Sequence, residues 1–322
     1  MASSSTTTTG ISDKTAAAPL TEEQESLHAP STEAATSDEE SVTDCFADMG
    51  FMFEGNQPSK LVHFKWKTGV TKRPVAVAVS AADDEPGAVI SGHYLWPAAE
   101  MLATYLLEQE TRLRPVTVVE LGAGCALASL AALQIWQDVL QCLVVTDHDP
   151  GTLERACDNH ESTLQELLDS SLTDEALNSA INDLGSIPVF FQGLEWGKQD
   201  ALLSIREILQ EHTNTRKGCF DVVLGSDLIY CLQVVEPLFQ TVADLMTLGQ
   251  HSVFILTQSF AYEEETEGEI DRVCEELGLL RTLISDDGKG NRIQEFGRQQ
   301  QHQLQEQQAV AKGNVADLQE PE

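Results

Sequence analysis

The chain has 322 residues, of which 52 are Asp or Glu and 19 are Lys or Arg, giving a formal net charge of −33. Phosphate contacts need clustered Lys and Arg, so this balance argues against nucleic acid as a partner and suits a basic protein. No apolar run approaches the roughly 18 residues of a membrane-spanning helix, and the first residues resemble neither a signal peptide nor a mitochondrial presequence. We therefore expect no membrane partner and a cytoplasmic location, with nucleus or plastid open.

The two ends of the chain look unable to build a core. Residues 1–45 contain a Ser/Thr run and nine acids against Lys14 alone, and residues 299–322 contain eight glutamines. Segments of this composition bury too little apolar surface to fold. We predict a disordered acidic arm over 1–45, a Gln-rich tail over 299–322 and one folded domain over 46–298, which still carries a charge of −22.

Within this domain, residues 46–115 are expected to form an N-terminal strand pair and a helix, ahead of a core over 116–298. The strand pair is predicted within 46–80, beside the functional site. The segment Gly92-His93-Tyr94-Leu95-Trp96-Pro97 then precedes an amphipathic helix that runs to about Glu108.

The segment from Val116 to Leu127 is the most informative part of the sequence. It predicts a buried strand over 116–121, a glycine turn and a helix over 125–136 that packs closely on the sheet. Gly122 and Gly124 let the backbone pass near a ligand, and the first N–H groups of the helix can face it. A dinucleotide site needs a third glycine where Leu127 stands. The pattern therefore favours a nucleotide cofactor without a pyrophosphate over an NAD-linked oxidoreductase.

The next predicted strand, 142–147, ends in Asp147, 23 residues beyond Gly124. In doubly wound folds a carboxylate at this place accepts hydrogen bonds from both ribose hydroxyls. Asp149 is expected to be the N-cap of a helix over 150–160, which Pro150 opens. A long acidic connection follows, with an extra helix predicted around 161–168.

Strands and helices continue to alternate after this connection. We predict strands at 188–191, 219–226, 252–258, 280–285 and 292–296, and helices at 199–211, 233–248 and 264–277. Such alternation is typical of a mostly parallel sheet with helices on both faces, and ligands bind at the carboxyl ends of its strands.

The seven cysteines form no Cys-x-x-Cys pair, and the eight histidines are scattered. We expect reduced cysteines in the core and no metal site.

Several motifs together resemble one family, methyltransferase family 16, the seven-β-strand protein-lysine methyltransferases. They are the segment from Gly92 to Ala99, Glu120-Leu-Gly122-Ala-Gly124, Asp147, Leu194-Glu195-Trp196-Gly197 and Asp227-Leu-Ile-Tyr230. The resemblance covers about residues 50–298. It implies an α/β, Rossmann-like class I methyltransferase fold, with a seven-stranded, mostly parallel sheet and an antiparallel C-terminal hairpin. It also implies S-adenosyl-L-methionine (SAM) as cofactor and a monomer that methylates lysine in a protein such as a chaperone or translation factor.

The resemblance assigns roles to residues at the carboxyl ends of the strands. The implied cofactor residues are Trp96 near the methionine end, Glu120 at the methionine ammonium through water, Gly122 and Gly124 along the methionine backbone, Asp147 at the ribose, Trp196 at the adenine, and Ser226. Asp227 and Tyr230 are implied as the catalytic pair. The carboxylate would attract the substrate ammonium, and the phenol would orient its nitrogen and stabilise methylated cations.

Alternatives remain open at this stage. The same fold could methylate histidine or a small amine, or the chain could be a non-catalytic interaction protein that binds SAM weakly or not at all. Trp96 and Trp196 could be core residues, and Asp227 and Tyr230 could be a helix N-cap and a buried tyrosine. Where many relatives of the family have an arginine after the fifth strand, this chain has Gln258-Ser259-Phe260-Ala261-Tyr262, so substrate preference is open there.

Overall fold

The structure is a computed structural model that describes residues 59–83, 91–171, 184–213, 219–246 and 252–298. All of them belong to one compact unit, Ser41–Glu322. The predicted arm over 1–45 and the predicted tail over 299–322 lie outside the described residues, as does 172–183 of the acidic connection.

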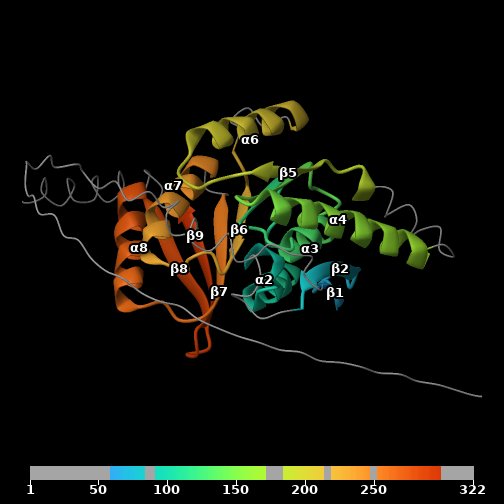
Figure 1. The fold of residues 1–322 in the computed structure, drawn as a ribbon, viewed down its shortest axis with the longest axis horizontal. Helices are drawn as coiled ribbons and strands as arrows, with labels where there is room; N and C mark the ends of the chain where they lie inside the picture. Colours follow the sequence, from blue (N-terminus) through green and yellow to red (C-terminus); the bar gives the residue numbers. More distant parts are fainter. Residues whose placement is uncertain (1–58, 84–90, 172–183, 214–218, 247–251, 299–322) are drawn as a thin grey trace, which may run out of the picture. The chain divides into compact units, whose positions relative to one another are not determined.

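A seven-stranded sheet has the order β5-β4-β3-β6-β7-β9-β8 (Figure 1). The first five strands in this order run parallel, and β9 pairs antiparallel with both β7 and β8. The strands are β3 (Thr117–Leu121), β4 (Cys142–Asp147), β5 (Val189–Gly193), β6 (Val222–Ser226), β7 (Val253–Ser259), β8 (Leu279–Asp286) and β9 (Asn291–Arg298). This confirms the predicted sheet with its antiparallel C-terminal hairpin.

Helices cover both faces of the sheet, because successive side chains of a strand point to opposite faces. Val118 of β3 belongs to the core beneath the first group of helices, and its neighbour Val119 belongs to the core beneath the second. The first group is α2 (Pro97–Glu108), α3 (Leu127–Ile135) and α4 (Pro150–Ser171); the second is α6 (Gln199–His212), α7 (Val235–Leu245) and α8 (Glu264–Leu277). Burial on both faces explains why the central strands are largely apolar.

A separate antiparallel pair, β1 (Ser59–Lys67) and β2 (Pro74–Ala82), lies against α3 and α4. Alternate N–H groups along β2 donate to side chains of these helices. The donors are Ala76 to Gln134 Oε1 (3.0 Å), Ala78 to Thr163 Oγ1 (3.2 Å) and Ser80 to Asn159 Oδ1 (2.7 Å). The edge of β2 is thereby satisfied without another strand.

The prediction for α4 was wrong in one respect. A helix over 150–160 and a separate helix around 161–168 were expected, but a single helix runs to Ser171. No proline or glycine interrupts it after Gly151, and Leu164 and Leu167 pack against the same core as its first turns. Anchoring of Asn159 and Thr163 to β2 holds the helix across the predicted break.

Cys125, Cys142, Cys157, Cys231 and Cys274 are free thiols, and Cys125, Cys142 and Cys274 are buried. Across the described ranges, no three or more His, Cys, Asp or Glu residues are grouped as a metal site would require. In the same residues no helix is long and apolar enough to span a membrane.

Candidate active site

The carboxyl ends of β3, β4 and β6 meet at one edge of the sheet, and the glycine turn after β3 lies there. Gly122 has φ 55° and Gly124 has φ 53°, both in the left-handed region that favours glycine. The N–H of Ala123 donates to the carbonyl of Thr146 at 2.9 Å, which ties the turn to the end of β4. The turn is thus fixed in its conformation, and at Gly122 and Gly124 no side chain shields the backbone.

The tight conformation at Gly124 predicts a specific effect of Gly124→Ala. The new Cβ would lie 3.2 Å from the carbonyl oxygen of Gly92, at a φ that disfavours alanine. We expect a loss of about 1–2 kcal/mol in the free energy of unfolding, measured by urea denaturation. Gly268→Ala in α8 is the matched control, because its Cβ would meet nothing within 4 Å; it should stabilise by about 0.5–1 kcal/mol. Equal effects of the two changes would contradict this description of the turn.

Asp147 is buried at the end of β4, and its carboxylate lies beneath the glycine turn. Oδ2 accepts the N–H of Gly124 at 3.2 Å, and Oδ1 accepts the N–H of Asp149 at 3.2 Å. The hydrogen bond to Asp147 raises the pKa of the neighbouring His148. Asp149 is the predicted N-cap of α4, since its Oδ2 accepts the N–H of Thr152 at 2.6 Å. The structure therefore brings Asp147 to the glycine turn and assigns Asp149 to the helix.

Glu120 lies at the end of β3, fully enclosed by protein. Its Oε2 accepts the N–H of Ser129 in the first turn of α3 at 2.9 Å. Burial raises the pKa of Glu120 to about 7, although the bond from Ser129 opposes this shift. The carboxylate thus links the strand before the turn to the helix after it, a contact that the motif alone did not indicate.

This raised pKa makes stability depend on pH in a defined direction. The folded chain holds the Glu120 proton more tightly than the unfolded chain, whose glutamate titrates near 4.5. The associated stability is complete below pH 4.5 and is lost as the pH rises through about 7. Glu120→Gln lacks this titration, so the variant should gain about 2.5 kcal/mol relative to the parent chain between about pH 5 and 8. Denaturation of both proteins at several pH values in this range tests the sign. A difference in the free energy of unfolding that stays constant with pH would contradict it.

The segment before α2 lies directly over the glycine turn. The Cys125 thiol donates to the carbonyl of His93 at 3.5 Å, and the Trp96 indole N–H donates to the carbonyl of Ser91 at 2.9 Å. Between this segment and the turn is a cavity of about 20 Å³, whose lining includes Trp96, Gly122, Gly124 and Ser226. This space holds about one water molecule, which is far less than a cofactor with a ribose and an adenine would need.

Trp196 approaches the glycine turn from the loop after β5. A Cβ on Gly122 would lie 3.4 Å from its Cζ2, and the N–H of Leu194 donates to the carbonyl of Asp147 at 2.9 Å. The indole is half-buried and packs against the core beneath the second group of helices. Trp196 thus lies next to the turn, where the face of its ring can also cover a ligand.

Asp227 follows β6 and joins three elements at the same edge. Its Oδ1 accepts the N–H of Ser259 at 2.6 Å, and its Oδ2 accepts the Ser259 hydroxyl at 2.7 Å and the N–H of Ala98 at 3.4 Å. Its own backbone has φ 52°. Burial raises the pKa of Asp227, although these hydrogen bonds oppose the shift. The carboxylate therefore connects the ends of β6 and β7 with the first turn of α2.

Tyr230 comes from the same loop but reaches the surface. Leu228 and Ile229 between them are buried, whereas 49% of Tyr230 is exposed.

Ser259 is a site residue whose contact with Asp227 the sequence did not reveal. Its position at the end of a strand parallel to β6 is the signal that could have indicated it.

The family model described as lysine methyltransferase matches residues 81–269, more than half of the chain. The chain belongs to the lysine methyltransferase family. The resemblance seen in the motifs is thereby confirmed.

Curated relatives are similar over part of their length. Protein N-lysine methyltransferase METTL21A of Xenopus tropicalis is 26% identical over 171 residues, which are 53% of this chain and 62% of the relative. Protein N-terminal and lysine N-methyltransferase EFM7 of Gibberella zeae is 25% identical over 161 residues, 50% of this chain and 55% of the relative. The matched part is thus less than two thirds of either relative.

A solved structure of magnesium protoporphyrin IX methyltransferase from Synechocystis PCC 6803, with bound SAM, is also similar. It has a TM-score of 0.37 and 15% identity, over 62% of this chain and 78% of that protein.

Proposed function

We propose that this lysine methyltransferase family member transfers a methyl group from SAM to the side-chain amine of a lysine in a protein substrate. The observation that carries the proposal is the buried Asp227 carboxylate, which lies at the same sheet edge as the glycine turn and Asp147. The relatives named as protein lysine methyltransferases support the choice of acceptor.

The residue types at this edge fit SAM. The methionine part of SAM can lie close to the backbone at Gly122 and Gly124, which have no side chains. The Asp147 carboxylate can accept hydrogen bonds from the ribose hydroxyls. Trp196 offers an aromatic face on which adenine can stack. Trp96 and Ser226 line the cavity beside the turn, and Glu120 lies behind it, where its Oε2 accepts the N–H of Ser129. The cavity of about 20 Å³ lies beside the glycine turn, where the cofactor is proposed to bind.

When bound, SAM supplies an electrophilic methyl group carried by a sulfonium. The chain's own task is to present a neutral amine, and a lysine is normally protonated. A carboxylate offers about four acceptor positions, and donors among the described residues occupy three of those of Asp227. The remaining position can accept an N–H of the incoming ammonium. Burial also raises the pKa of Asp227, which makes it a stronger base than an exposed aspartate and favours movement of the lysine proton toward it.

Tyr230 is proposed as the second residue of the amine pocket. It follows Asp227 in the same loop, and its half-exposed ring is accessible to a substrate that arrives from solvent. The phenol oxygen can orient the amine, and the ring face can stabilise the methylated ammonium product.

The test is incubation of the full chain with radiolabelled SAM and a protein extract from its source organism, with Asp147→Ala as control. We expect label in a protein band with the parent chain and none with the variant. Label in the small-molecule fraction alone would favour the alternative acceptor. No binding of SAM by the parent chain would overturn the proposal in favour of an interaction protein.

The monomeric state and the cytoplasmic location are part of the same proposal, as is a folded partner such as a chaperone or translation factor. Light scattering during gel filtration tests the first, and a fluorescent fusion tests the second. Identification of the labelled band tests the third.

A further inference from the structure

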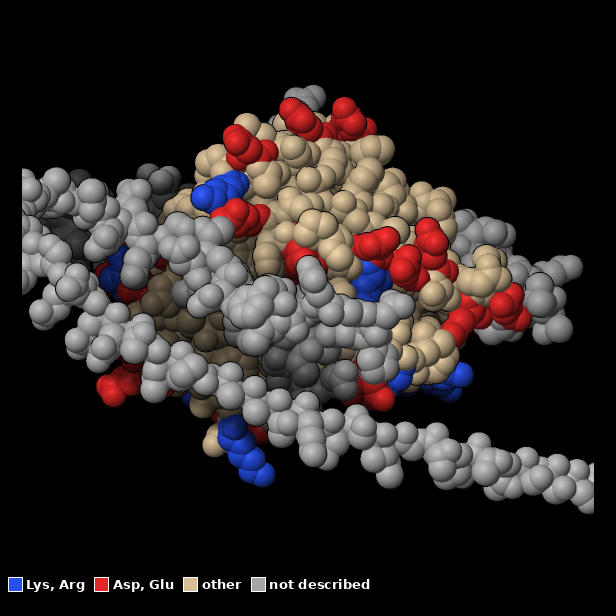
Figure 2. Space-filling view, viewed as in Figure 1, with Lys and Arg blue, Asp and Glu red and all other residues tan. Residues whose placement is uncertain are grey.

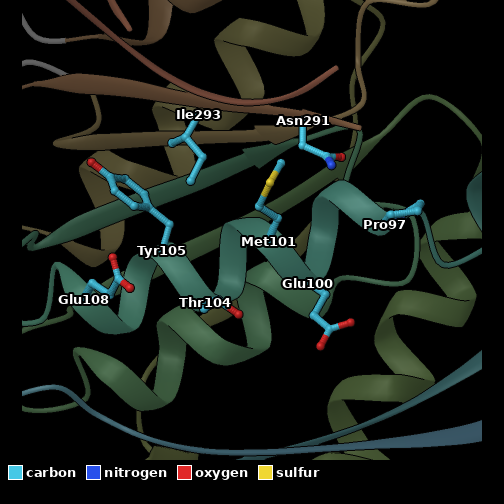
Figure 3. Close-up of a pocket in the computed structure, with 8 residues that line it drawn as sticks. All are labelled: Pro97, Glu100, Met101, Thr104, Tyr105, Glu108, Asn291 and Ile293. Atoms are coloured by element: carbon cyan, nitrogen blue, oxygen red, sulfur yellow. The ribbon is translucent and has the colours of Figure 1, made fainter. Parts of the chain in front are cut away.

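A groove of about 400 Å³ lies between α2 and β9, outside the cofactor site (Figure 3). Its floor is mainly apolar. Met101 and Tyr105 point from α2 toward β9, where they meet Ile293 and Asn291, and Pro97 lies at one end. The hydroxyl of Tyr105 donates to Glu295 at 2.7 Å, which fixes the ring as part of the floor. The groove is thus a built feature of the helix and strand.

One end of the groove adjoins the residues that hold Asp227. Pro97 directly precedes Ala98, whose N–H donates to Asp227. Asn291 is paired across β7 and β9 with Ser259, whose N–H and hydroxyl both donate to Asp227. A chain that lies in the groove would therefore have one end at the proposed amine pocket.

The outer wall of the groove is acidic. Glu100, Thr104 and Glu108 follow one another at intervals of four residues, so they form a single exposed stripe along α2. In Figure 3 they lie beside the stripe that carries Met101 and Tyr105. At the far end Glu295 is paired with Arg112, so the two acids of the stripe determine the sign of the charge that a ligand would meet.

The side of the molecule seen in Figure 2 agrees with a basic ligand. Acidic side chains are spread over α6 and α4 in this view, with few basic ones between them. Long-range attraction would therefore bring a basic segment toward the chain, and the groove would order it.

We infer that this α2–β9 groove binds the basic segment that flanks the target lysine of the protein substrate. The inference rests on the proposed function. Glu100 and Glu108 are eight residues apart, about 12 Å along a helix, which an extended peptide covers in about four residues. Measured from Pro97, they lie opposite about the first and fifth residues from the target lysine. A substrate with Arg or Lys at these two places fits the groove.

The probes are fluorescein-labelled peptides with one central lysine and arginine at the first and fifth positions on one side of it. One version carries the arginines on the N-terminal side and one on the C-terminal side, and matched peptides carry glutamine instead. Anisotropy at low ionic strength should show that the full chain binds one arginine version at least ~5-fold more tightly than its glutamine match. Equal binding, or no binding of either arginine version, would overturn the inference.

The variant that tests the groove is Glu100→Gln with Glu108→Gln. It should lose the preference for arginine while keeping its SAM affinity. The matched control is Glu264→Gln with Glu265→Gln, which removes two exposed charges from α8 on the opposite face of the sheet and should keep the preference. Retention of the preference by the groove variant would contradict the assignment. Equal loss in both variants would mean that general charge, and not the groove, selects the peptide.

The same preparations are assayed for label transfer to the extract, which separates the two proposals. Weaker labelling by the groove variant than by the α8 control would support both. Absence of label with the parent chain would overturn the proposed function, whereas equal labelling by all three preparations would overturn the groove alone. A dimer that Met101→Glu dissociates would assign the groove to a second copy of this chain and overturn the inference.

Discussion

Asp227→Asn is expected to lower methyl transfer by a factor of about 100 or more while it changes SAM affinity by less than about threefold. Asparagine keeps the shape of the side chain and tolerates the positive φ at this position, so the fold should persist. It removes the negative charge that attracts the substrate ammonium and the basic oxygen that can take its proton. Calorimetry with SAM and a labelling assay on one preparation measure the two effects separately.

The matched control is Asp221→Asn at the opposite end of the same strand. The Asp221 carboxylate accepts the N–H groups of Val116 at 2.8 Å and Thr117 at 3.1 Å, so its role is structural and lies away from the carboxyl edge. This variant should lose some stability but keep its turnover. If Asp227→Asn retained full turnover, or if both variants lost it equally, Asp227 would not be the residue that receives the amine.

Asp147→Ala is expected to have the largest effect on cofactor affinity. Hydrogen bonds to a charged group are each worth about 1.5–3 kcal/mol, so loss of a carboxylate that accepts two ribose hydroxyls should raise the dissociation constant for SAM by about 100-fold or more. The N–H of Gly124 also loses its acceptor, which loosens the glycine turn. Isothermal titration calorimetry gives the value directly.

Asp149→Ala separates this effect from damage to the neighbouring helix. Asp149 caps α4 through Thr152, so its loss should lower the free energy of unfolding by about 1 kcal/mol and leave SAM affinity within a few-fold. An affinity that falls equally in both variants would mean that Asp147 acts through local structure and not through the ribose.

Much of the fold follows from local patterns in the sequence. Apolar β-branched runs predicted strands that the structure places within a few residues, because strands buried on both faces are rich in apolar residues. The break that we predicted near residue 160 of α4 is absent, and its absence depends on a distant contact. The polar residues Asn159 and Thr163 look like the start of a loop, yet they bond to the edge of β2, and sequence order gives no indication of that partner.

In the candidate site, too, features formed by neighbouring segments of the sequence were easier to predict than contacts between distant residues. The glycine turn and Asp147 were predictable because their spacing along the chain reflects one strand-turn-helix-strand unit. The bond from Ala98 to Asp227 was not, since these residues are 129 positions apart in the sequence. The bond from Ser259 could be anticipated only from the order of the strands, which places the ends of β6 and β7 side by side. The small cavity beneath the segment before α2 could not be predicted from the sequence either, because its size depends on how residues from several elements pack together.

The most direct test of the central claim is the chemical identity of the methylated residue. Protein labelled by the full chain and radiolabelled SAM is hydrolysed to amino acids, which are separated beside methyl-lysine and methyl-histidine standards. We predict that the label runs with methyl-lysine and is missing when Asp227→Asn replaces the parent chain. Label in methyl-histidine or on an N-terminal amine would contradict the lysine assignment, and undiminished label with the variant would contradict the site.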